Sequence, residues 1–313
     1  ISRNLGMFMS KICSYCVLDE SVGHLIFDKN GRCSACKQGE SVLQRDYHPN
    51  EKGKTLIDNM VSKLKHEGAT QSHDCIIGLS GGIDSAYLAH IVVKEFGLKP
   101  LAIHVDGGWN SEKAVRNINL IVDKLDIDLH TEVIEWQEMR DLQLAFLKSG
   151  VINQDMPQDH AFFASLYSAA SKFGVKSFLS GVNLATESIV MLGDSGHPSI
   201  DGKHLLAIHK QFGRAALTTF PLMSVEKYTY LSQILKMPKI YKPLNWVAYD
   251  KEKAKRLLEN EYSWIDYGTK HSESRFTKFY QEVYLPKKVN YDKRRLHLSS
   301  LIVAGQCDRS DAI

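Results

Sequence analysis

The segment Ser80-Gly81-Gly82-Ile83-Asp84-Ser85 carries residue types that bind phosphate groups. It follows the apolar run 75–79 and precedes a stretch with an apolar stripe, which predicts a buried strand, a glycine turn and a helix. Glycines let the backbone approach an anion closely and adopt positive φ. Free N–H groups and the positive dipole end at the helix start attract the same anion. The segment therefore predicts a phosphate site to which Ser80 and Ser85 add hydroxyl donors.

Asp84 adds a second kind of chemistry to this loop. A carboxylate would repel phosphate by itself, so its presence indicates a bridging Mg²⁺. The loop is not a Walker motif, because no Lys follows its glycines. The triplet Gly53-Lys54-Thr55 has His48 where that motif needs its first glycine and no strand before it, so we interpret it as unrelated.

Four of the six cysteines have the spacing of metal ligands. They form two CxxC pairs, Cys13 with Cys16 and Cys33 with Cys36. This pattern predicts a closed tetrahedral site for structural Zn²⁺ in a small ribbon. Two disulfides or an iron–sulfur cluster are the alternatives. The other two cysteines, Cys75 and Cys307, stand alone, and we expect structural roles for them.

The elements around the phosphate loop alternate between strands and helices. We expect strands at 99–105, 127–134 and 176–179, and helices at 54–65, 111–125, 136–147 and 161–173. The alternation predicts an α/β fold with a doubly wound, mostly parallel, Rossmann-like sheet. Ligands of such sheets bind beyond the carboxyl ends of the strands. The candidate residues at these ends are Leu79, Val105, Asp106 and Gly181.

Two later positions extend this candidate site. Asn183 and Glu187 are four residues apart and follow a predicted strand, so Glu187 is a candidate Mg²⁺ ligand together with Asp84. The alternative is a solvated helix start. Asp106 could meet the ribose or the adenine of a nucleotide, or simply shape a turn. The candidate catalytic residues are therefore Asp84, Ser85 and Glu187.

The substrate candidates lie mostly in the last third of the chain, which is rich in polar and aromatic residues. They share charge or hydrogen-bonding capacity, and they are Asp159, Lys270, His271, Arg275, Arg294 and Arg295. Arginine forks would recognise an anionic sugar or a nucleotide diphosphate. The alternatives are a solvated basic face and, for Asp159, a helix cap.

The bulk composition excludes some partners. The 313 residues carry a formal net charge of +3, which gives no argument for nucleic acid or a membrane surface. We see no apolar run of membrane-spanning length and no secretory segment, and we expect a cytoplasmic protein.

The loop resembles the PP-loop of the ATP pyrophosphatases, which split ATP into AMP and pyrophosphate. The CxxC pairs, IIGLSGGIDS, VDGGWNS, SGVNLATE and WIDYGTKHSESRFTKF with DKRRLHLS, in this order, resemble the N-acetyl sugar amidotransferases of the WbpG/PseA type. That family acts in bacterial O-antigen and flagellin-glycan pathways. The similarity runs from about Lys11 to the end. Members of the family usually run somewhat past a point like Ile313, so the resemblance implies a C-terminal truncation.

The resemblance implies a reaction, cofactors and partners. An N-acetyl (acetamido) group of a free or nucleotide-linked sugar would become acetamidino through an O-adenylated imidate, with release of AMP and pyrophosphate. ATP, Mg²⁺ and structural Zn²⁺ are implied, with ammonia from a separate glutaminase and a cyclase-like subunit similar to those of histidine biosynthesis. ATP would contact residues 79–82, Asp84, Ser85, Val105, Asp106, Gly181 and Asn183.

Two other functions compete with this one. A PP-loop tRNA thiolation enzyme would need further cysteines near the ATP site, and only Cys75 and Cys307 remain. A non-enzymatic binding protein whose ATP site is inactive would have lost residues of the phosphate loop, whereas SGGIDS is intact.

The sequence divides into four expected parts. Residues 1–8, which precede Met9, are expected to be a tag or disordered. A zinc-ribbon module covers 9–45, and the PP-loop ATP pyrophosphatase domain covers 46–240. Residues 241–313 form a helical region for the substrate or a partner.

Overall fold

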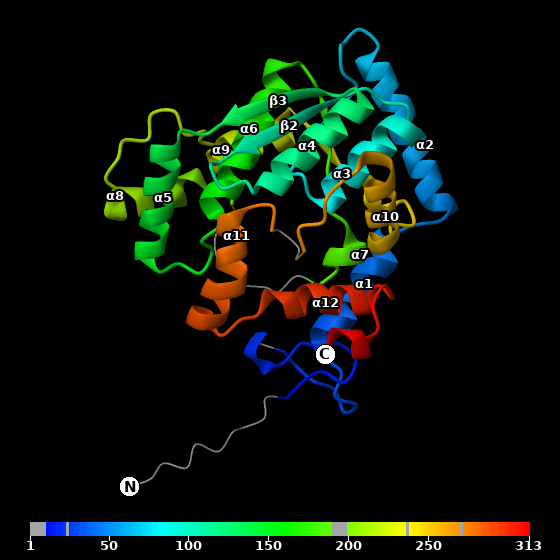
Figure 1. Ribbon diagram of the computed structural model, residues 1–313, viewed down its shortest axis with the longest axis vertical. Coiled ribbons are helices and arrows are strands. Elements are labelled where there is room, and N and C mark those ends of the chain that lie inside the picture. The colour runs from blue at the N-terminus through cyan, green and yellow to red at the C-terminus, as the bar shows by residue number, and fades with distance from the viewer. Residues whose placement is uncertain (1–10, 23–24, 190–198, 236–237, 269–271) are drawn as a thin grey trace. The chain divides into compact units, whose positions relative to one another are not determined.

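The computed structural model describes residues 11–22, 25–189, 199–235, 238–268 and 272–313 (Figure 1). Residues 1–8 and two substrate candidates, Lys270 and His271, lie outside the described residues. The chain folds into two compact units. The ribbon unit comprises Ile1–Tyr47, Leu184–Leu192 and Gln281–Ile313, and the sheet unit comprises His48–Asn183 and Gly193–Tyr280. The four expected parts follow the order of the chain, whereas these units do not.

The sheet unit contains five parallel strands in the order β3-β2-β1-β4-β5. The strands are β1 (Cys75–Gly78), β2 (Pro100–Asp106), β3 (Asp128–Val133), β4 (Ser177–Leu179) and β5 (Lys239–Tyr241). In the centre, Ile77 of β1 lies between Ala102 of β2 and Leu179 of β4. The expected doubly wound parallel sheet is therefore confirmed.

Helices cover both faces of this sheet (Figure 1). The α-helices of the sheet unit are α2 (Glu51–Gly68), α3 (Ile83–His90), α4 (Glu112–Leu125), α5 (Trp136–Ser149), α6 (Met156–Lys172), α8 (Gly202–Phe212), α9 (Val225–Thr229), α10 (Lys251–Tyr262) and α11 (Arg275–Phe279). Short π- or 3₁₀-helical stretches are η2 (Ile91–Glu95), η3 (Tyr230–Ile234) and η4 (Pro243–Asn245).

Side-chain caps set the starts of α2 and α4, which lie within three residues of the positions that the sequence predicts. Asn50 accepts a hydrogen bond from the N–H of Lys52, so α2 begins at Glu51 instead of residue 54. Ser111 accepts from the N–H of Ala114 at the start of α4. These caps fix the ends of the helices relative to the loops that follow β1 and β2.

The core of the sheet unit joins helix α6 to the central strands. Ile76, Leu101 and Ile103 pack with Leu166 and Ala170. A second buried cluster joins α5, α6 and α8 through Met139, Phe146, Met156, Leu205 and Phe220. The parallel pairing of the strands puts their carboxyl ends on the same side of the sheet.

Helix α5 also binds a loop through a buried carboxylate. Glu138 accepts hydrogen bonds from the N–H groups of Thr218, Thr219 and Phe220 and from the Thr218 hydroxyl. Burial raises the pKa of Glu138, but these hydrogen bonds outweigh burial and lower it from 4.5 to about 2. The loop is thereby tied to α5.

The ribbon unit is assembled from three separate parts of the chain. Its helices are α1 (Ser34–Asp46), α7 (Leu184–Glu187) and α12 (Lys293–Val303), with 3₁₀ turns η1 (Glu20–Val22) and η6 (Arg309–Ala312). The π-helix η5 (Tyr280–Val289) begins at the boundary between the units. The N–H of Ile189 donates to Ser300 Oγ, and the N–H of Val17 donates to Ser299 Oγ. The N-terminal cysteine segment therefore folds together with the C-terminal helix.

Within the described part of the chain, no helix combines the length and apolar character needed to cross a membrane.

Candidate active site and cysteine centre

The phosphate loop has its hydroxyl groups gathered around its backbone. The hydroxyls of Ser80 and Ser85 lie 3.2 Å apart. The N–H of Ser80 donates to Ser85 Oγ (3.3 Å), and the N–H of Gly82 donates to Ser80 Oγ (3.2 Å). The loop leads from β1 into the first turn of α3, where backbone N–H groups lack partners within the helix. These are the donors that an anion requires.

The first glycine of the loop cannot be replaced without a shift of the backbone. Gly81 has φ +82°, and a Cβ there would lie 2.4 Å from the carbonyl oxygen of Ala114 in α4. Gly81 therefore permits both a left-handed conformation and the close approach of α4.

The carboxylate of Asp84 is held by two donors from other parts of the sheet unit. Tyr249 OH donates to Asp84 Oδ1 at 2.5 Å, and Asn183 Nδ2 donates to the same oxygen at 3.1 Å. Burial and then the charge of Asp84 raise the pKa of Tyr249, so the phenol keeps its proton. The sequence predicts Asp84 and Asn183 at one site, but it gave no signal for Tyr249.

The end of β2 carries a second polar network. Asp106 Oδ1 accepts hydrogen bonds from the N–H of Gly108 (2.8 Å) and from Asn110 Nδ2 (3.0 Å). Burial lowers the pKa of His104, so its ring is neutral. His104 Nδ1 donates to the carbonyl of Leu79, and Nε2 accepts from Asn110 Nδ2. This network ties the end of β2 to the residue before the phosphate loop.

The last strand end expected at the site approaches the phosphate loop as well. A Cβ on Gly181 would lie 3.2 Å from the carbonyl oxygen of Asp84 and 3.4 Å from the backbone nitrogen of Ser85. Leu79 is buried, while Val105 is partly buried and packs against both core clusters. The ends of β1, β2 and β4 therefore meet around α3, as the parallel sheet requires.

A segment from late in the chain is bonded directly to the phosphate loop. Trp264 Nε1 donates to the carbonyl oxygen of Gly81 at 3.0 Å, and Asn117 Nδ2 of α4 donates to the same oxygen at 3.3 Å. Asn117 also pairs with the backbone of Ile265, accepting from its N–H (2.8 Å) and donating to its carbonyl (2.9 Å). The sequence offers no local sign of these contacts, which link residues far apart in the chain.

Tyr267 and Glu273 continue this segment at the second glycine. A Cβ on Gly82 would lie 2.9 Å from Tyr267 OH and 3.5 Å from Glu273 Oε1. Burial and then the charges of Glu273 and Asp84 raise the pKa of Tyr267. The polar and aromatic density around residues 264–276 was the one signal in the sequence for these side chains.

The same segment also pairs with the loop after β2. The N–H of Ser111 donates to the carbonyl of Glu273 (2.8 Å), and the N–H of Arg275 donates to the carbonyl of Trp109 (2.8 Å). The ring centres of Trp109 and Phe276 lie 5.5 Å apart. Residues late in the sheet unit therefore border two of the three strand ends.

Glu187 belongs to the other unit. It ends helix α7 in the ribbon unit, whereas Asp84, Gly181 and Asn183 lie in the sheet unit. Joint binding of Mg²⁺ by Asp84 and Glu187 therefore stays a prediction.

The described substrate candidates have different surroundings. Asp159, in the first turn of α6, accepts a hydrogen bond from the Ser199 hydroxyl (3.3 Å). Arg275 is exposed and lies 3.7 Å from Glu112. Both lie in the sheet unit, and their role in substrate binding stays a prediction.

Arg294 and Arg295 both lie in the ribbon unit, on α12. Arg294 is exposed and pairs with Asp292 at 2.6 Å. Arg295 pairs with Asp19 at 2.7 Å and donates to the carbonyl of Val17. Arg295 therefore has a structural partner in the cysteine segment, whereas Arg294 faces solvent.

The four cysteines of the ribbon unit lie together and are fully buried. Their four sulfur atoms lie within 4.8 Å of one another, with Cys13–Cys36 and Cys16–Cys33 at 3.8 Å and Cys33–Cys36 at 3.5 Å. Zn–S bonds of about 2.3 Å in a tetrahedron place the sulfurs about 3.8 Å apart. The donor set therefore fits a single tetrahedral ion. An iron–sulfur cluster would separate the thiolates further, because its irons and sulfides lie between them.

Backbone donors and the C-terminus complete this centre. The N–H groups of Cys16 and Cys33 donate to Cys13 Sγ at 3.4 Å and 3.2 Å. Arg309 donates to the carbonyl oxygens of Cys16 (3.1 Å) and Cys13 (3.2 Å). Four thiols so close cannot all ionise without a cation, so the site fits Zn²⁺ as a structural ion.

The lone cysteines do not form a second centre. Cys75 is fully buried in β1, and burial raises the pKa of its thiol. Cys307 lies in the ribbon unit, where Asp308 is its hydrogen-bond partner. The core position of Cys75 fits the structural role expected from the sequence.

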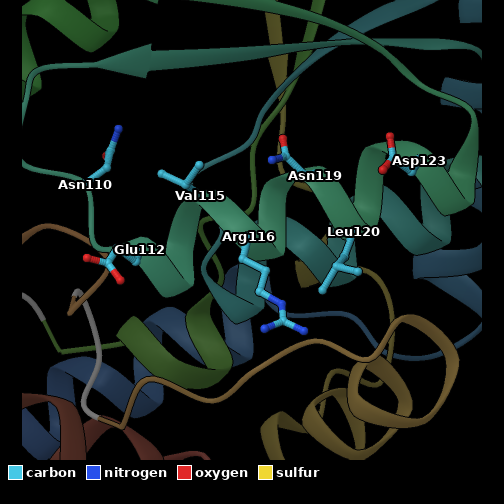
Figure 2. Close-up of a pocket in the computed structure, with 7 residues that line it drawn as sticks. All are labelled: Asn110, Glu112, Val115, Arg116, Asn119, Leu120 and Asp123. Carbon is cyan, nitrogen blue, oxygen red and sulfur yellow. The ribbon is translucent and has the colours of Figure 1, made fainter.

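A shallow hollow of about 430 Å³ follows the outer face of α4 (Figure 2). Its lining residues are Asn110, Glu112, Val115, Arg116, Asn119, Leu120 and Asp123. Figure 2 shows most of these side chains along one helix. The lining of this described hollow contains no residue of the phosphate loop, and we assign no function to it.

Two family profiles match the chain. Residues 54–171 match NAD synthase, and residues 273–313 match the C-terminal domain of LPS biosynthesis protein WbpG-like proteins. The resemblance to the WbpG-type PP-loop proteins is confirmed. These matches support an ATP-using enzyme of the PP-loop class, with ATP and Mg²⁺ as its ligands. No curated protein matches the sequence.

Solved structures resemble the chain only distantly. NMN synthetase from Francisella tularensis is 18% identical, with a TM-score of 0.34 over 69% of this chain and 97% of that one. U34-tRNA thiolase NcsA from Methanococcus maripaludis is 16% identical, with a TM-score of 0.40 over 95% of this chain and 87% of that one. At these values the likenesses do not distinguish between functions.

Proposed function

We propose that the protein is an ATP-dependent, AMP-forming amidotransferase that converts an acetamido group of a sugar into an acetamidino group. The observation that carries the proposal is the combination of an intact phosphate loop with a WbpG-like C-terminal match in one chain. The physiological setting would be the synthesis of a bacterial surface polysaccharide or flagellin glycan, in the cytoplasm.

The chemistry requires activation of a poor electrophile. The amide oxygen of the sugar attacks the α-phosphorus of ATP, and the bond to the β-phosphate breaks to release pyrophosphate. Ammonia then adds to the carbon of the O-adenylated imidate, and AMP leaves as the amidine forms. Each step uses a group that the substrates supply, so no protein nucleophile is needed.

The phosphate loop would serve the first step by binding the leaving pyrophosphate. The hydroxyls of Ser80 and Ser85 and the N–H groups near Gly82 are gathered at one place. Donors fixed before the reaction stabilise developing charge without reorganisation. Holding the amide and the α-phosphorus in line can contribute about 7–11 kcal/mol to lowering the barrier.

Asp84 is the residue that would hold Mg²⁺, with Glu187 as the proposed second ligand. Mg²⁺ supplies neutralisation of the charge that develops on the phosphate oxygens. Tyr249 and Asn183 fix the orientation of the Asp84 carboxylate. Asp106, at the end of β2, would contact the ribose or the adenine.

The remaining parts of the proposal concern the ribbon, the substrate and the partners. The four cysteines would hold Zn²⁺ as a structural ion. Arg294 and Arg275 are the exposed candidates for contacts to an anionic sugar or its nucleotide carrier. Ammonia would come from a glutaminase and a cyclase-like subunit.

A product assay tests the proposal. The protein is incubated with ATP, Mg²⁺, ammonium and a panel of nucleotide-linked and free N-acetyl sugars, and mass spectrometry follows the sugar and the nucleotide. The proposal predicts AMP together with a sugar in which NH replaces one oxygen. AMP formation that depends on tRNA and sulfide instead would favour the thiolation alternative.

A further inference from the structure

The peptide between the two glycines of the phosphate loop has an orientation that neither glycine fixes. Gly81 and Gly82 have no side chains, and their backbone can adopt conformations closed to other residues. A rotation of this peptide would turn the N–H of Gly82 away from the loop and place the carbonyl oxygen of Gly81 there. A carbonyl oxygen at that place would repel phosphate.

Two buried donors hold this carbonyl oxygen. Trp264 Nε1 and Asn117 Nδ2 donate to the oxygen of Gly81 at 3.0 Å and 3.3 Å. Trp264 is 4% exposed and Asn117 is fully buried. Since burial removes water as an alternative partner, rotation of the peptide would leave the indole N–H of Trp264 unsatisfied and would cost Asn117 Nδ2 one of its two hydrogen bonds.

The planarity of the peptide transmits this constraint to the anion site. In a trans peptide the N–H points away from the preceding C=O. With the Gly81 oxygen held by Trp264 and Asn117, the Gly82 N–H points toward Ser80 Oγ and donates to it at 3.2 Å. The Ser85 hydroxyl lies 3.2 Å from the same Ser80 oxygen. The constraint therefore puts the Gly82 N–H beside the two hydroxyls.

Asn117 also places Trp264 for this contact. Its amide forms two hydrogen bonds with the backbone of Ile265, the residue next to Trp264. This pairing fixes the position of the late segment along α4. The same helix lies close to the loop, because a Cβ on Gly81 would lie 2.4 Å from the carbonyl oxygen of Ala114.

We infer that Trp264 and Asn117 are positioning residues that hold the Gly81–Gly82 peptide in the orientation that binds pyrophosphate. The inference rests on the proposed function, because it takes the loop to be the pyrophosphate site. It adds that the affinity of the loop depends on a segment about 180 residues away, whose indole N–H serves as a backbone clamp.

The test measures binding of Mg²⁺-pyrophosphate to the full chain by titration calorimetry. Trp264→Phe removes the N–H donor and keeps an aromatic ring. We expect its Kd for pyrophosphate to rise roughly 3- to 10-fold. The KM for ATP should rise in parallel while the KM for the sugar stays the same. The matched control is Trp246→Phe, because Trp246 packs on Tyr241 instead, and this variant should bind like the wild type.

Asn117→Asp provides a second variant. It keeps an acceptor for the N–H of Ile265 but places a carboxylate oxygen against the carbonyl of Gly81, so its Kd should rise more than that of Trp264→Phe. If Asn117→Asp does not fold, the comparison of Trp264→Phe with Trp246→Phe still decides the matter.

Two results would overturn the inference, and they are distinguishable. If the wild type binds pyrophosphate and Trp264→Phe binds it equally well, the positioning role of Trp264 is wrong while the proposed function stands. If the wild type binds neither pyrophosphate nor ATP, the proposed function fails together with the inference.

Discussion

Asp84 is the single residue on which the proposed chemistry depends most. Tyr249 and Asn183 donate hydrogen bonds to its carboxylate. An asparagine at this position keeps the size of the side chain and an oxygen for these donors, but it has no charge. We expect Asp84→Asn to lower AMP formation by roughly 10²–10³-fold, because the charge that binds Mg²⁺ is gone. Circular dichroism and melting should show an intact fold. Normal AMP release by a folded variant would rule out the metal role.

Arg294 and Arg295 are neighbours with different surroundings, and the difference makes a prediction. Arg294 is exposed and is a proposed contact to the sugar. Arg294→Ala should therefore raise the KM for the sugar and leave the melting temperature unchanged. Arg295 pairs with Asp19, so Arg295→Ala should lower the free energy of unfolding of the ribbon unit by about 1–3 kcal/mol. Steady-state kinetics and thermal melting of both variants separate the two roles. Equal effects on both quantities would contradict this assignment.

The sequence shows some site residues and conceals others for a physical reason. Ser80, Asp84 and Ser85 are visible because strand, glycine turn and helix follow one another directly. Tyr249 and Trp264 reach the same loop from distant positions, and a hydrogen bond from an aromatic side chain to a distant residue leaves no periodic pattern in the sequence. Such contacts depend on the tertiary fold.

At the scale of elements, helix α5 and the loop at 218–220 form a pair whose stability depends on pH. The pKa of Glu138 is lowered from 4.5 to about 2 in the folded state, so the ionised carboxylate stabilises the fold above pH 4.5, and this contribution is lost as pH falls toward 2. Glu138→Gln should lower the free energy of unfolding by about 1–3 kcal/mol at pH 7.

The pH dependence tests this origin. The difference between wild type and Glu138→Gln should shrink between pH 4.5 and 2, measured by denaturant unfolding. Glu259→Gln on the exposed face of α10 is the control and should change little at any pH. A difference that does not vary with pH would contradict an electrostatic origin.

The order and type of the elements were predictable, but some of their ends were not. The strand expected at 99–105 is β2 (Pro100–Asp106), one residue later than expected. The helix expected at 161–173 is α6 (Met156–Lys172), which has Pro157 in its first turn, a position that proline favours. Periodicity identifies the middle of a helix, whereas caps and first-turn residues decide where it begins.

At the scale of the whole molecule, the cysteine segment and the C-terminus form one unit. Arg309 donates to the carbonyls of Cys13 and Cys16, so loss of the metal should loosen both ends of the chain. Cys33→Ser should lose bound zinc, measured by atomic emission, and limited proteolysis should become faster at both 11–47 and 281–313. Unchanged metal content and unchanged proteolysis would contradict a structural zinc site.

The sequence shows the two CxxC pairs but not this partnership. Residues 1–47 and 281–313 are at opposite ends of the chain, and Ser299 and Arg295 reach the cysteine segment only in the folded unit. No local pattern specifies which distant helix a small ribbon packs on, because such a module has little core of its own.

The most direct test of the proposed amidotransferase activity is the dependence of AMP formation on its proposed substrates. The purified protein is given ATP and Mg²⁺ with an N-acetyl sugar panel and ammonium, together and with each omitted, and AMP and the sugar are followed by mass spectrometry. The proposed function predicts AMP and an acetamidino sugar in equal amounts, and neither when the sugar or ammonium is left out. AMP that forms equally well without any sugar, with every sugar unchanged, would contradict it.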